Sequence, residues 1–317
     1  MAVTYIDGVL YVDNSILSTY ATCPLKAMIS YGLDRRPVGP ENPNLKMGKA
    51  IHTALEYYFT KSPPQTCLNI LKAEYEDWAK QNIFDNKRLS WQNIENVFKS
   101  WMNKYPQNKL PFRVALENVE IAVDVPLNKE GDIIFTGRID MLAHARYGES
   151  MFAVDHKCTG TLDARKKKEY SMTSQMSGYL WALREMGKDI SGIYINAVHV
   201  GVVPTSERKC KTHKVYYEEC GFLHMNHELM GPYHRSDDDL NEWHQDALLL
   251  AQEWKSALDY VDGDITKIND LQQRGKWIYQ GCVNCDWYDY CKSGKPNHWI
   301  NEQTVIDPWK PGVLGDE

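Results

Sequence analysis

The chain has 317 residues, of which 43% are hydrophobic, 25% charged and 11% aromatic, as in an ordinary globular protein. No stretch approaches the roughly 18 apolar residues of a membrane span, and the N-terminus lacks a signal-peptide layout, so we expect a cytoplasmic protein without membrane segments. The net charge of −6 is mild evidence against a nucleic-acid binder. Eight cysteines without an export signal argue against a disulfide framework and favour a metal or cluster site.

The N-terminal third reads as helical. A first helix is predicted from Asn14-Ser15, with Cys23-Pro24 inside it. After a loop, Lys46 to Phe59 predicts a second helix that carries His52. Taken alone, His52 is more often explained as a structural histidine than as a metal ligand. Apolar residues at helical spacing then continue through a helical insertion.

A predicted strand follows, because Val119, Ile121, Val123 and Val125 alternate with Glu120, Ala122 and Asp124. It leads into a second strand whose alternation runs through Gly137-Arg138-Ile139-Asp140, so we expect Asp140 at a strand end.

After a turn, Met151 to Lys157 reads as a third strand, on which Asp155 and Lys157 face the same side. An antiparallel hairpin would bring Asp140 to this pair. Two carboxylates suit Mg²⁺, which prefers oxygen ligands and keeps several waters. Lys157 would then orient a water or offset charge in the transition state of phosphodiester hydrolysis. The alternative is a surface hairpin with solvated charges.

Basic residues gather directly after this hairpin. The run Arg165-Lys166-Lys167-Lys168 stands where a phosphate backbone would lie, although a solvated face is the plainer interpretation. A helix predicted from about Ser171 to Met186 places Gln175 and Tyr179 on one face.

Two more strands are predicted, Ile193 to Val203 and Lys214 to Phe222, before a long helix with an apolar stripe from Leu240 to Leu258. We therefore expect one α/β domain over residues 1–317, with a helical insertion at about 61–112, a catalytic core at about 113–235, and a C-terminal helix and cluster-binding segment at about 238–300.

Three cysteines, Cys282, Cys285 and Cys291, lie within a short C-terminal segment. Thiolates at this spacing are typical ligands of a soft metal, and either zinc or an iron–sulfur cluster could be bound by them. Cys23 is an isolated cysteine that could supply a fourth ligand by bringing the first helix to the C-terminus. The alternative is a set of thiols without a metal.

In chain order these features resemble the RecB-like branch of the PD-(D/E)XK nuclease superfamily. The resemblance is particularly to its iron–sulfur members, which include CRISPR-associated adaptation nucleases, helicase-linked nuclease domains and phage exonucleases. The resemblance spans most of the chain and is carried by Ser15 to Cys23-Pro24, Gly48-Lys49-Ala50-Ile51-His52, Gly137-Arg138-Ile139-Asp140, Asp155-His156-Lys157, Gln175 to Tyr179, and Cys282, Cys285 and Cys291.

The resemblance implies a restriction-endonuclease-like mixed sheet flanked by helices, with a C-terminal iron–sulfur clasp. It implies that Mg²⁺ or Mn²⁺ is held by His52, Asp140, Asp155 and the main-chain carbonyl of His156. Lys157 would be the catalytic lysine. Gln175 and Tyr179 would support the site and contact DNA. A [4Fe–4S] cluster would be held by Cys23, Cys282, Cys285 and Cys291.

We therefore expect a metal-dependent DNA nuclease, an exonuclease acting on single-stranded DNA or duplex ends, with Arg138 and the basic run in contact with DNA and a helicase or recombination protein as partner. One alternative is a non-catalytic DNA-binding or assembly factor, and another is a zinc-clasped binding module. One departure from the family is Cys158, where many relatives carry Thr; it leaves the local phosphate contacts open.

Overall fold

The computed structural model describes residues 5–39, 41–83, 85–202, 214, 225–278 and 281–311. Within these ranges, eight strands form a sheet in the order β1-β2-β6-β7-β8-β9, with β4 and β5 also paired to β6. The pairs β2–β6 and β7–β8 are parallel and the others antiparallel, so the predicted mixed sheet is confirmed. The strands are β1 (Tyr5–Ile6), β2 (Val9–Val12), β4 (Phe112–Arg113), β5 (Val119–Pro126), β6 (Ile133–Ala145), β7 (Met151–Thr159), β8 (Ile193–His199) and β9 (Glu228–Tyr233).

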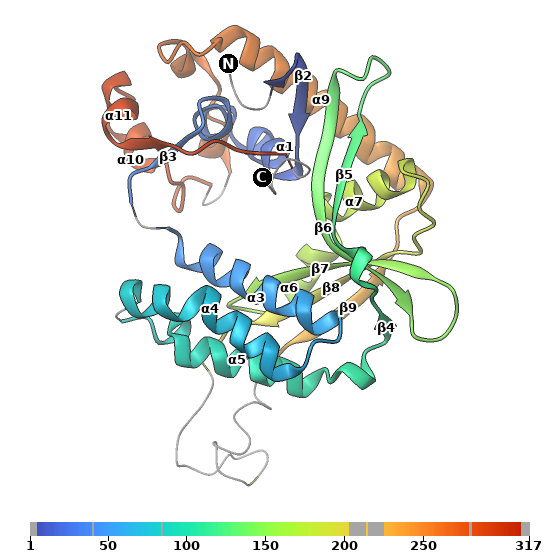
Figure 1. The fold of residues 1–317 in the computed structure, drawn as a ribbon. Coiled ribbons are helices and arrows are strands. Elements are labelled where there is room, and N and C mark those ends of the chain that lie inside the picture. Colours follow the sequence, from blue (N-terminus) through green and yellow to red (C-terminus); the bar gives the residue numbers. More distant parts are fainter. Residues whose placement is uncertain are drawn as a thin grey trace.

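Helices cover both faces of the sheet (Figure 1). Alternate residues of β7 and β8 separate two apolar cores: Ala153 and Ala197 join one, and Val154 and Val198 the other. The first core also contains side chains of α1 (Asn14–Thr22), α7 (Ser174–Glu185) and α9 (Asp237–Val261). The second contains side chains of α3 (Pro43–Phe59), α4 (Pro64–Asn82) and α5 (Trp91–Lys104).

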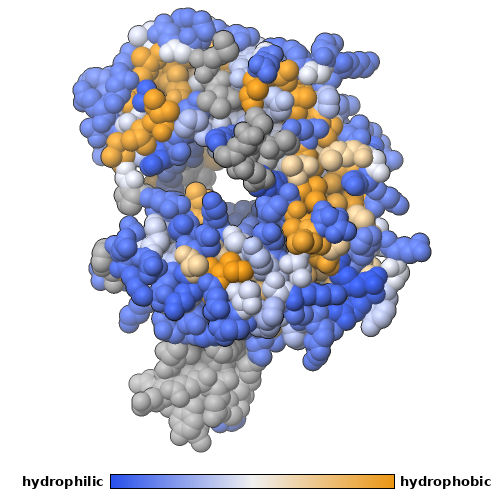
Figure 2. All heavy atoms as spheres, in the orientation of Figure 1, coloured by the Kyte–Doolittle hydropathy of each residue, from blue (hydrophilic) through white to orange (hydrophobic). Residues whose placement is uncertain are grey.

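The C-terminal segment packs against the N-terminal helices. Its β10 (Thr304–Ile306) pairs with β3 (Arg35–Pro37) in a separate two-stranded sheet. The indole of Trp309 donates to Asp13 Oδ2 at 3.0 Å, and that of Trp287 to Ser30 Oγ at 2.9 Å. The short helices here are α2 (Pro24–Ala27), α10 (Tyr288–Lys292) and α11 (Asn297–Glu302). Figure 2 shows an opening in the surface between this part of the molecule and the part that contains α3.

The first helix differs from its prediction at its C-terminal end. It begins at Asn14, where the side chain of Asp13 caps it by accepting from Ile16 N at 2.7 Å. It ends at Thr22, so Cys23 is not inside it but is an extended residue before α2. The cause is Pro24, which has no N–H to donate and disfavours helical backbone at the residue before it.

The end of β6 also differs, because the strand continues through Asp140 to Ala145. The residues beyond Asp140 pair with β7 from Met141 onward, and β4 pairs with its last two residues. The helix predicted from Ser171 to Met186 corresponds to α7 and begins three residues later, at Ser174; a separate helix, α6 (Ala164–Ser171), which was not predicted, precedes it over the basic run. The strand predicted from Lys214 to Phe222 lies, apart from its first residue, outside the described residues. Across the described ranges, no helix is long and apolar enough to cross a membrane.

Candidate active site

The two predicted carboxylates lie on neighbouring strands. Met141 on β6 is opposite Val154 on β7, so Asp140 and Asp155 stand one position beyond the last described pair of that ladder. On the far side of β7, parallel β8 holds the strand, with Asp155 opposite Ile195. The antiparallel hairpin expected from the sequence therefore places both acids at the same point of the sheet.

Lys157 connects Asp155 to α7. Its Nζ lies 3.0 Å from Oδ1 and 2.8 Å from Oδ2 of Asp155 and donates to Gln175 Oε1 at 2.9 Å. Gln175 Nε2 donates to the hydroxyl of Tyr179 at 2.9 Å, and that hydroxyl donates to the main-chain oxygen of Arg138 at 2.9 Å. The i, i+4 pair on α7 thus ties β7 to β6.

Gly137 allows this close approach of α7 to β6. A Cβ at Gly137 would lie 3.1 Å from Cε1 of Tyr179, closer than most real Cβ contacts. Any larger residue would push the Tyr179 ring away from the strand, and with it the hydroxyl that reaches Arg138.

Asp140 accepts from two neighbours. The main-chain N–H of His156 donates to Oδ2 at 2.5 Å, and His52 Nδ1 on α3 lies 3.5 Å from Oδ1. Burial alone would raise the pKa of Asp140, but the hydrogen bond and charge of His52, together with His156, hold it below its ordinary value. Burial lowers the pKa of His52, yet its hydrogen bonds with Asp140 and Cys158 raise it well above the ordinary value overall. Asp140 is thus an ionised carboxylate in this structure.

Asp155 is buried, and only one of its two carboxylate oxygens accepts a hydrogen bond. Its Oδ2 has no hydrogen-bond donor among the described residues, because Lys157 approaches it closely but without hydrogen-bond geometry. Burial, followed by the charge of Asp140, raises the pKa of Asp155, and Lys157 opposes that shift. Burial would lower the pKa of Lys157, but the charge of Asp155 raises it overall. An additional positive charge near Oδ2 would stabilise the ionised form of Asp155.

His156 is held by a buried polar contact that sequence reasoning missed. Asn196 Nδ2 on β8 lies 3.1 Å from His156 Nδ1, and Asn196 Oδ1 accepts from Trp101 Nε1 at 2.9 Å. Phe59 stacks on the imidazole at a centroid distance of 5.3 Å. Burial lowers the pKa of His156 to about 3, so its ring is neutral. The contact could have been predicted only from the parallel pairing of β7 with β8, which places Asn196 opposite His156.

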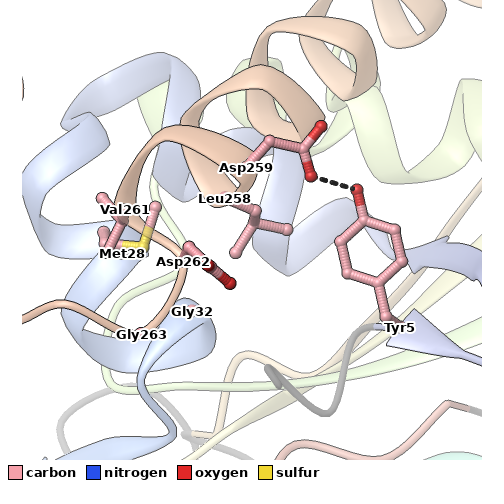
Figure 3. Close-up of a pocket in the computed structure, with 8 residues that line it drawn as sticks. All are labelled: Tyr5, Met28, Gly32, Leu258, Asp259, Val261, Asp262 and Gly263. Carbon is pink, nitrogen blue, oxygen red and sulfur yellow. Dashed lines mark hydrogen bonds between the residues drawn. The ribbon is translucent and has the colours of Figure 1, made fainter.

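Four of the site residues, His52, Asp140, His156 and Lys157, line a cavity of about 920 Å³, whereas the buried Asp155 is not part of its lining. Its lining contains three cations, Lys49, Arg138 and Lys157. It also contains Asp140, His52, His156, Cys158, Glu41, Glu56 and Glu120. A smaller cavity of about 200 Å³, where Tyr5 donates to Asp259 Oδ1 at 3.2 Å, is lined by none of the predicted site residues (Figure 3). The larger cavity is therefore the candidate active site.

Two other cavity residues have contacts that the sequence did not reveal. Glu120 Oε2 lies 3.7 Å from Arg138 Nη1, and burial raises the pKa of Glu120 to about 7, with a smaller contribution from Asp140. The thiol of Cys158 interacts with the His52 imidazole. The strand alternation placed Glu120 on the face opposite Val119 and Ile121, and it gave no sign of the contact with Arg138.

The basic run lies on α6 and is partly paired within the chain. Lys167 forms an ion pair with Glu228, and Lys166 lies 2.7 Å from Glu169 Oε1. Arg165 and Lys168 are exposed and have no ion pair within the part of the chain that the structure describes. The basic run therefore contains two lysines in ion pairs, Lys166 and Lys167, and two exposed cations, Arg165 and Lys168.

The structure brings Cys23 to the three C-terminal cysteines. A Cβ on Gly275 would lie 3.6 Å from Cys282 Sγ and 4.0 Å from Cys23 Sγ, so these two thiols flank one glycine. Burial raises the pKa values of Cys285 and Cys291, and the neighbouring thiols, including Cys23, raise them further. All four are free thiols of intermediate exposure.

No group of three or more His, Cys, Asp or Glu side chains among the described residues is placed to hold a metal ion as it stands. The residues at the hairpin nevertheless suit Mg²⁺ chemically. Two carboxylates are enough for this ion, which keeps most of its ligands as water. The Oδ2 of Asp155 is a buried oxygen that accepts no hydrogen bond from the described residues, although the Lys157 ammonium lies 2.8 Å away.

A family model described as the PD-(D/E)XK nuclease superfamily matches residues 14–292. A search of curated proteins found no match. The matched range contains both carboxylates, Lys157, the α7 pair and all four clustered cysteines. Because the match covers most of the chain, the protein belongs to the PD-(D/E)XK nuclease superfamily.

Proposed function

We propose that this protein is a divalent-metal-dependent deoxyribonuclease of the RecB-like branch that acts as an exonuclease on single-stranded DNA or duplex ends. The observation that carries the proposal is the placement of Asp140 and Lys157 in the lining of one cavity, with the buried carboxylate of Asp155 ion-paired to Lys157. Membership of a nuclease superfamily supports the same chemistry.

Asp140 and Asp155 would hold Mg²⁺ or Mn²⁺, with the main-chain carbonyl of His156 and the imidazole of His52 completing the set. A bound cation supplies a lowered water pKa and charge compensation on the phosphoryl oxygens. For His52 to bind, its ring nitrogen would have to release Asp140, from which it now lies 3.5 Å away.

Lys157 would act on the transition state. Its ammonium is fixed by Asp155 on one side and Gln175 on the other, so it is preorganised where negative charge develops. Gln175 and Tyr179 would keep it there, because they anchor α7 to the main chain of β6. Arg138 and Lys49 would bind the flanking phosphates in the cavity.

The test uses purified protein with 5′-labelled and 3′-labelled single strands, duplexes with frayed ends, and circular single-stranded DNA, each with Mg²⁺, Mn²⁺ or EDTA. We expect metal-dependent release of short products from linear DNA and no cutting of circles. Asp155→Asn should abolish cleavage. Cutting of circles would show an endonuclease, and DNA binding without cleavage under any condition would favour the non-catalytic assembly factor.

We further propose that Cys23, Cys282, Cys285 and Cys291 hold a [4Fe–4S] cluster that clasps the two ends of the chain. The convergence of four thiols from distant segments supports it, since such a site needs four thiolate ligands. Zinc remains the second candidate for the same thiols, and metal analysis separates the two. A helicase or recombination partner stays a prediction from the resemblance.

A further inference from the structure

Another cavity, of about 370 Å³, lies beyond the C-terminal end of α3, where β4 pairs with the end of β6. Its lining consists of four apolar residues, two amides and three cations: Phe59, Leu110, Phe112, Val114, Gln107, Asn108, Lys61, Arg113 and Arg146. Among the described residues that line it there is no carboxylate, whereas the candidate active site has Asp140 and three glutamates in its lining. A concave surface lined by cations of one sign attracts anions.

Arg146 is fixed at the wall of this cavity by main-chain oxygens. Its Nε donates to Leu110 O at 2.6 Å, Nη1 to Asn108 O at 2.8 Å and Nη2 to Gln107 O at 3.1 Å. Two of the five N–H groups of the guanidinium then have no partner among the described residues. Because carbonyl groups carry no net charge, Arg146 keeps its full positive charge beside the cavity.

Lys61 brings a second cation to the cavity from an unusual backbone position. It follows the end of α3 with a φ of 69°, and Ser62 N donates to Tyr57 O at 2.9 Å. Glycine is the usual residue at such a helix end, because a Cβ disfavours this conformation. A cation is also favoured at the C-terminal end of a helix, so Lys61 alone could be explained without a ligand.

That explanation does not extend to Arg113, which lies on β4. None of Lys61, Arg113 and Arg146 forms an ion pair with a described residue, so three cations share one cavity without a counter-charge. Their mutual repulsion would be relieved by an anion, and arginine binds phosphate in a bidentate manner. The apolar part of the lining favours an anion that also carries an apolar or aromatic group.

We propose that this cavity binds a nucleotide through its phosphate, outside the candidate active site. The phosphate would contact Lys61, Arg113 and the free N–H groups of Arg146, with the deoxynucleoside against the apolar wall. The choice of a nucleotide rests on the proposed function. The same chemistry is offered by a free mononucleotide and by a phosphate within a DNA strand.

Phe59 separates this cavity from the candidate active site. Its ring stacks on Phe112 at a centroid distance of 5.6 Å and on His156 at 5.3 Å. Of these three residues, Phe59 and Phe112 line the cavity described here and His156 lines the larger one. The two cavities are therefore neighbours with separate linings, and substitutions can address them one at a time.

The test is calorimetric titration of the full chain with deoxyadenosine monophosphate in EDTA at low salt. EDTA removes divalent cations, so binding is read without cleavage. We expect Arg113→Gln and Lys61→Gly each to weaken binding by about tenfold, the size of one charge-assisted phosphate contact. Lys61→Gly should keep a thermal midpoint close to that of the wild type, because the relieved backbone offsets the lost charge at the helix end.

Lys109→Gln is the matched control, because Lys109 is an exposed cation beside the same turn but does not line the cavity. It should leave binding of the mononucleotide unchanged within about twofold. Titration with deoxyadenosine, which lacks the phosphate, and with inorganic phosphate, which lacks the nucleoside, should each show binding at least about tenfold weaker than the mononucleotide.

An unphosphorylated hexamer of deoxyadenosine distinguishes the two sources of the phosphate. If Arg113→Gln and Lys61→Gly weaken its binding as they weaken that of the mononucleotide, the cavity takes a phosphate of a strand. If they weaken only the mononucleotide, a free nucleotide is the occupant.

The inference would be overturned by a wild-type protein that does not bind the mononucleotide, or by binding that neither cavity substitution weakens. Equal binding of deoxyadenosine, or of inorganic phosphate, would show that no nucleotide is recognised. A protein that fails in these titrations but cleaves DNA with Mg²⁺ contradicts this inference alone. A protein that binds the mononucleotide in this cavity but never cleaves DNA contradicts the proposed nuclease activity and leaves the inference standing.

Discussion

Lys157 stands between Asp155 and Gln175, so its removal separates binding from chemistry. We expect Lys157→Ala to lose turnover by about 100-fold or more, the size typical of one preorganised electrostatic group. Mn²⁺ binding should stay equal or become tighter, because the cation loses a competitor for the Asp155 oxygens. Rates under saturating DNA and a parallel Mn²⁺ titration measure the two effects.

Asp155→Asn is the comparison for this variant, since it should lose Mn²⁺ binding and cleavage together. Full activity in Lys157→Ala would contradict the role given to the lysine. A joint loss of turnover and Mn²⁺ binding in Lys157→Ala would mean that the lysine serves only to keep Asp155 in place.

Local spacing was enough to predict which of these side chains share a face. Asp155 and Lys157 share a strand face, and Gln175 and Tyr179 share a helix face, so period-two and i, i+4 rules suffice. The positions of Asn196 and Glu120 in the site could not be predicted in this way, because they depend on which strands pair and in which register. Nothing in the sequence around Asn196 tells that β8 runs parallel to β7 beside His156.

At the scale of single elements, α6 tests the DNA contact. Its exposed pair, Arg165 and Lys168, should contribute more to DNA binding than Lys166 and Lys167, which are already engaged by Glu169 and Glu228. Replacing both exposed residues with Gln should reduce the slope of log affinity against log salt by about 1.4 for single-stranded DNA, since each neutralised phosphate contributes about 0.7.

The matched variant replaces Lys166 and Lys167 with Gln and should change that slope by less than half as much. Fluorescence anisotropy with a labelled strand in EDTA measures both without cleavage. If the two double variants behave alike, or neither changes the slope, α6 is a solvated face and not a phosphate contact.

A second element-scale prediction concerns His227, which lies before β9. Its Nδ1 accepts from the main-chain N–H of His199 at 3.0 Å, and its Nε2 lies 3.2 Å from Ser100 Oγ on α5. Protonation of Nδ1 would turn this acceptor into a donor facing another donor. Burial, with smaller contributions from His199 and Lys104, lowers the pKa of His227 to about 3.

Because the folded pKa lies below the unfolded value, this stabilisation is complete above about pH 6.5 and is lost as pH falls towards 3. Between pH 7 and 5 the free energy of unfolding should fall by about 2 kcal/mol from this residue, at 1.36 kcal/mol per pH unit. His227→Asn should be less stable at pH 7 but lose less between pH 7 and 5. Urea unfolding of both proteins at pH 7 and at pH 5 measures the change in the free energy of unfolding. An equal loss of stability in the wild type and in His227→Asn would contradict the role given to His227.

Element boundaries show where sequence rules reach their limit. Pro24 carried enough local information to end α1 at Thr22, yet a continuous helix was predicted because the apolar pattern runs on to Leu25. In β6 the reverse holds. The extension of the strand past Asp140 depends on pairing with β7 and β4, which no local pattern encodes.

For the whole molecule, the α/β class could be predicted because strand and helix periods alternate along the central part of the chain, whereas the mixed sheet was implied by the resemblance to the nuclease superfamily. The sheet order could not. The parallel pairing of β2 with β6 joins segments separated by the whole helical region, and only long-range packing fixes it. The approach of Cys23 to the C-terminal cysteines was inferred from the need for a fourth ligand.

The four cysteines give the last prediction. Protein purified without oxygen should be brown, with broad absorbance near ~400 nm from thiolate-held iron, and iron and sulfide should both be found by analysis. Cys282→Ala should lose the colour and lower the thermal midpoint by about 5 °C or more, because metal binding contributes directly to folding and the clasp closes a very long loop.

Cys67→Ala is the control, because Cys67 is buried in α4 and belongs to the other apolar core. It is expected to melt lower through lost packing while keeping the full iron content, so colour and stability change together only at the clasp. If analysis found one zinc per chain and neither iron nor sulfide, the four cysteines would hold zinc and not an iron–sulfur cluster. A colourless wild-type protein without bound metal, in which Cys282→Ala melts at the same temperature, would show that the four thiols meet without holding the chain ends together.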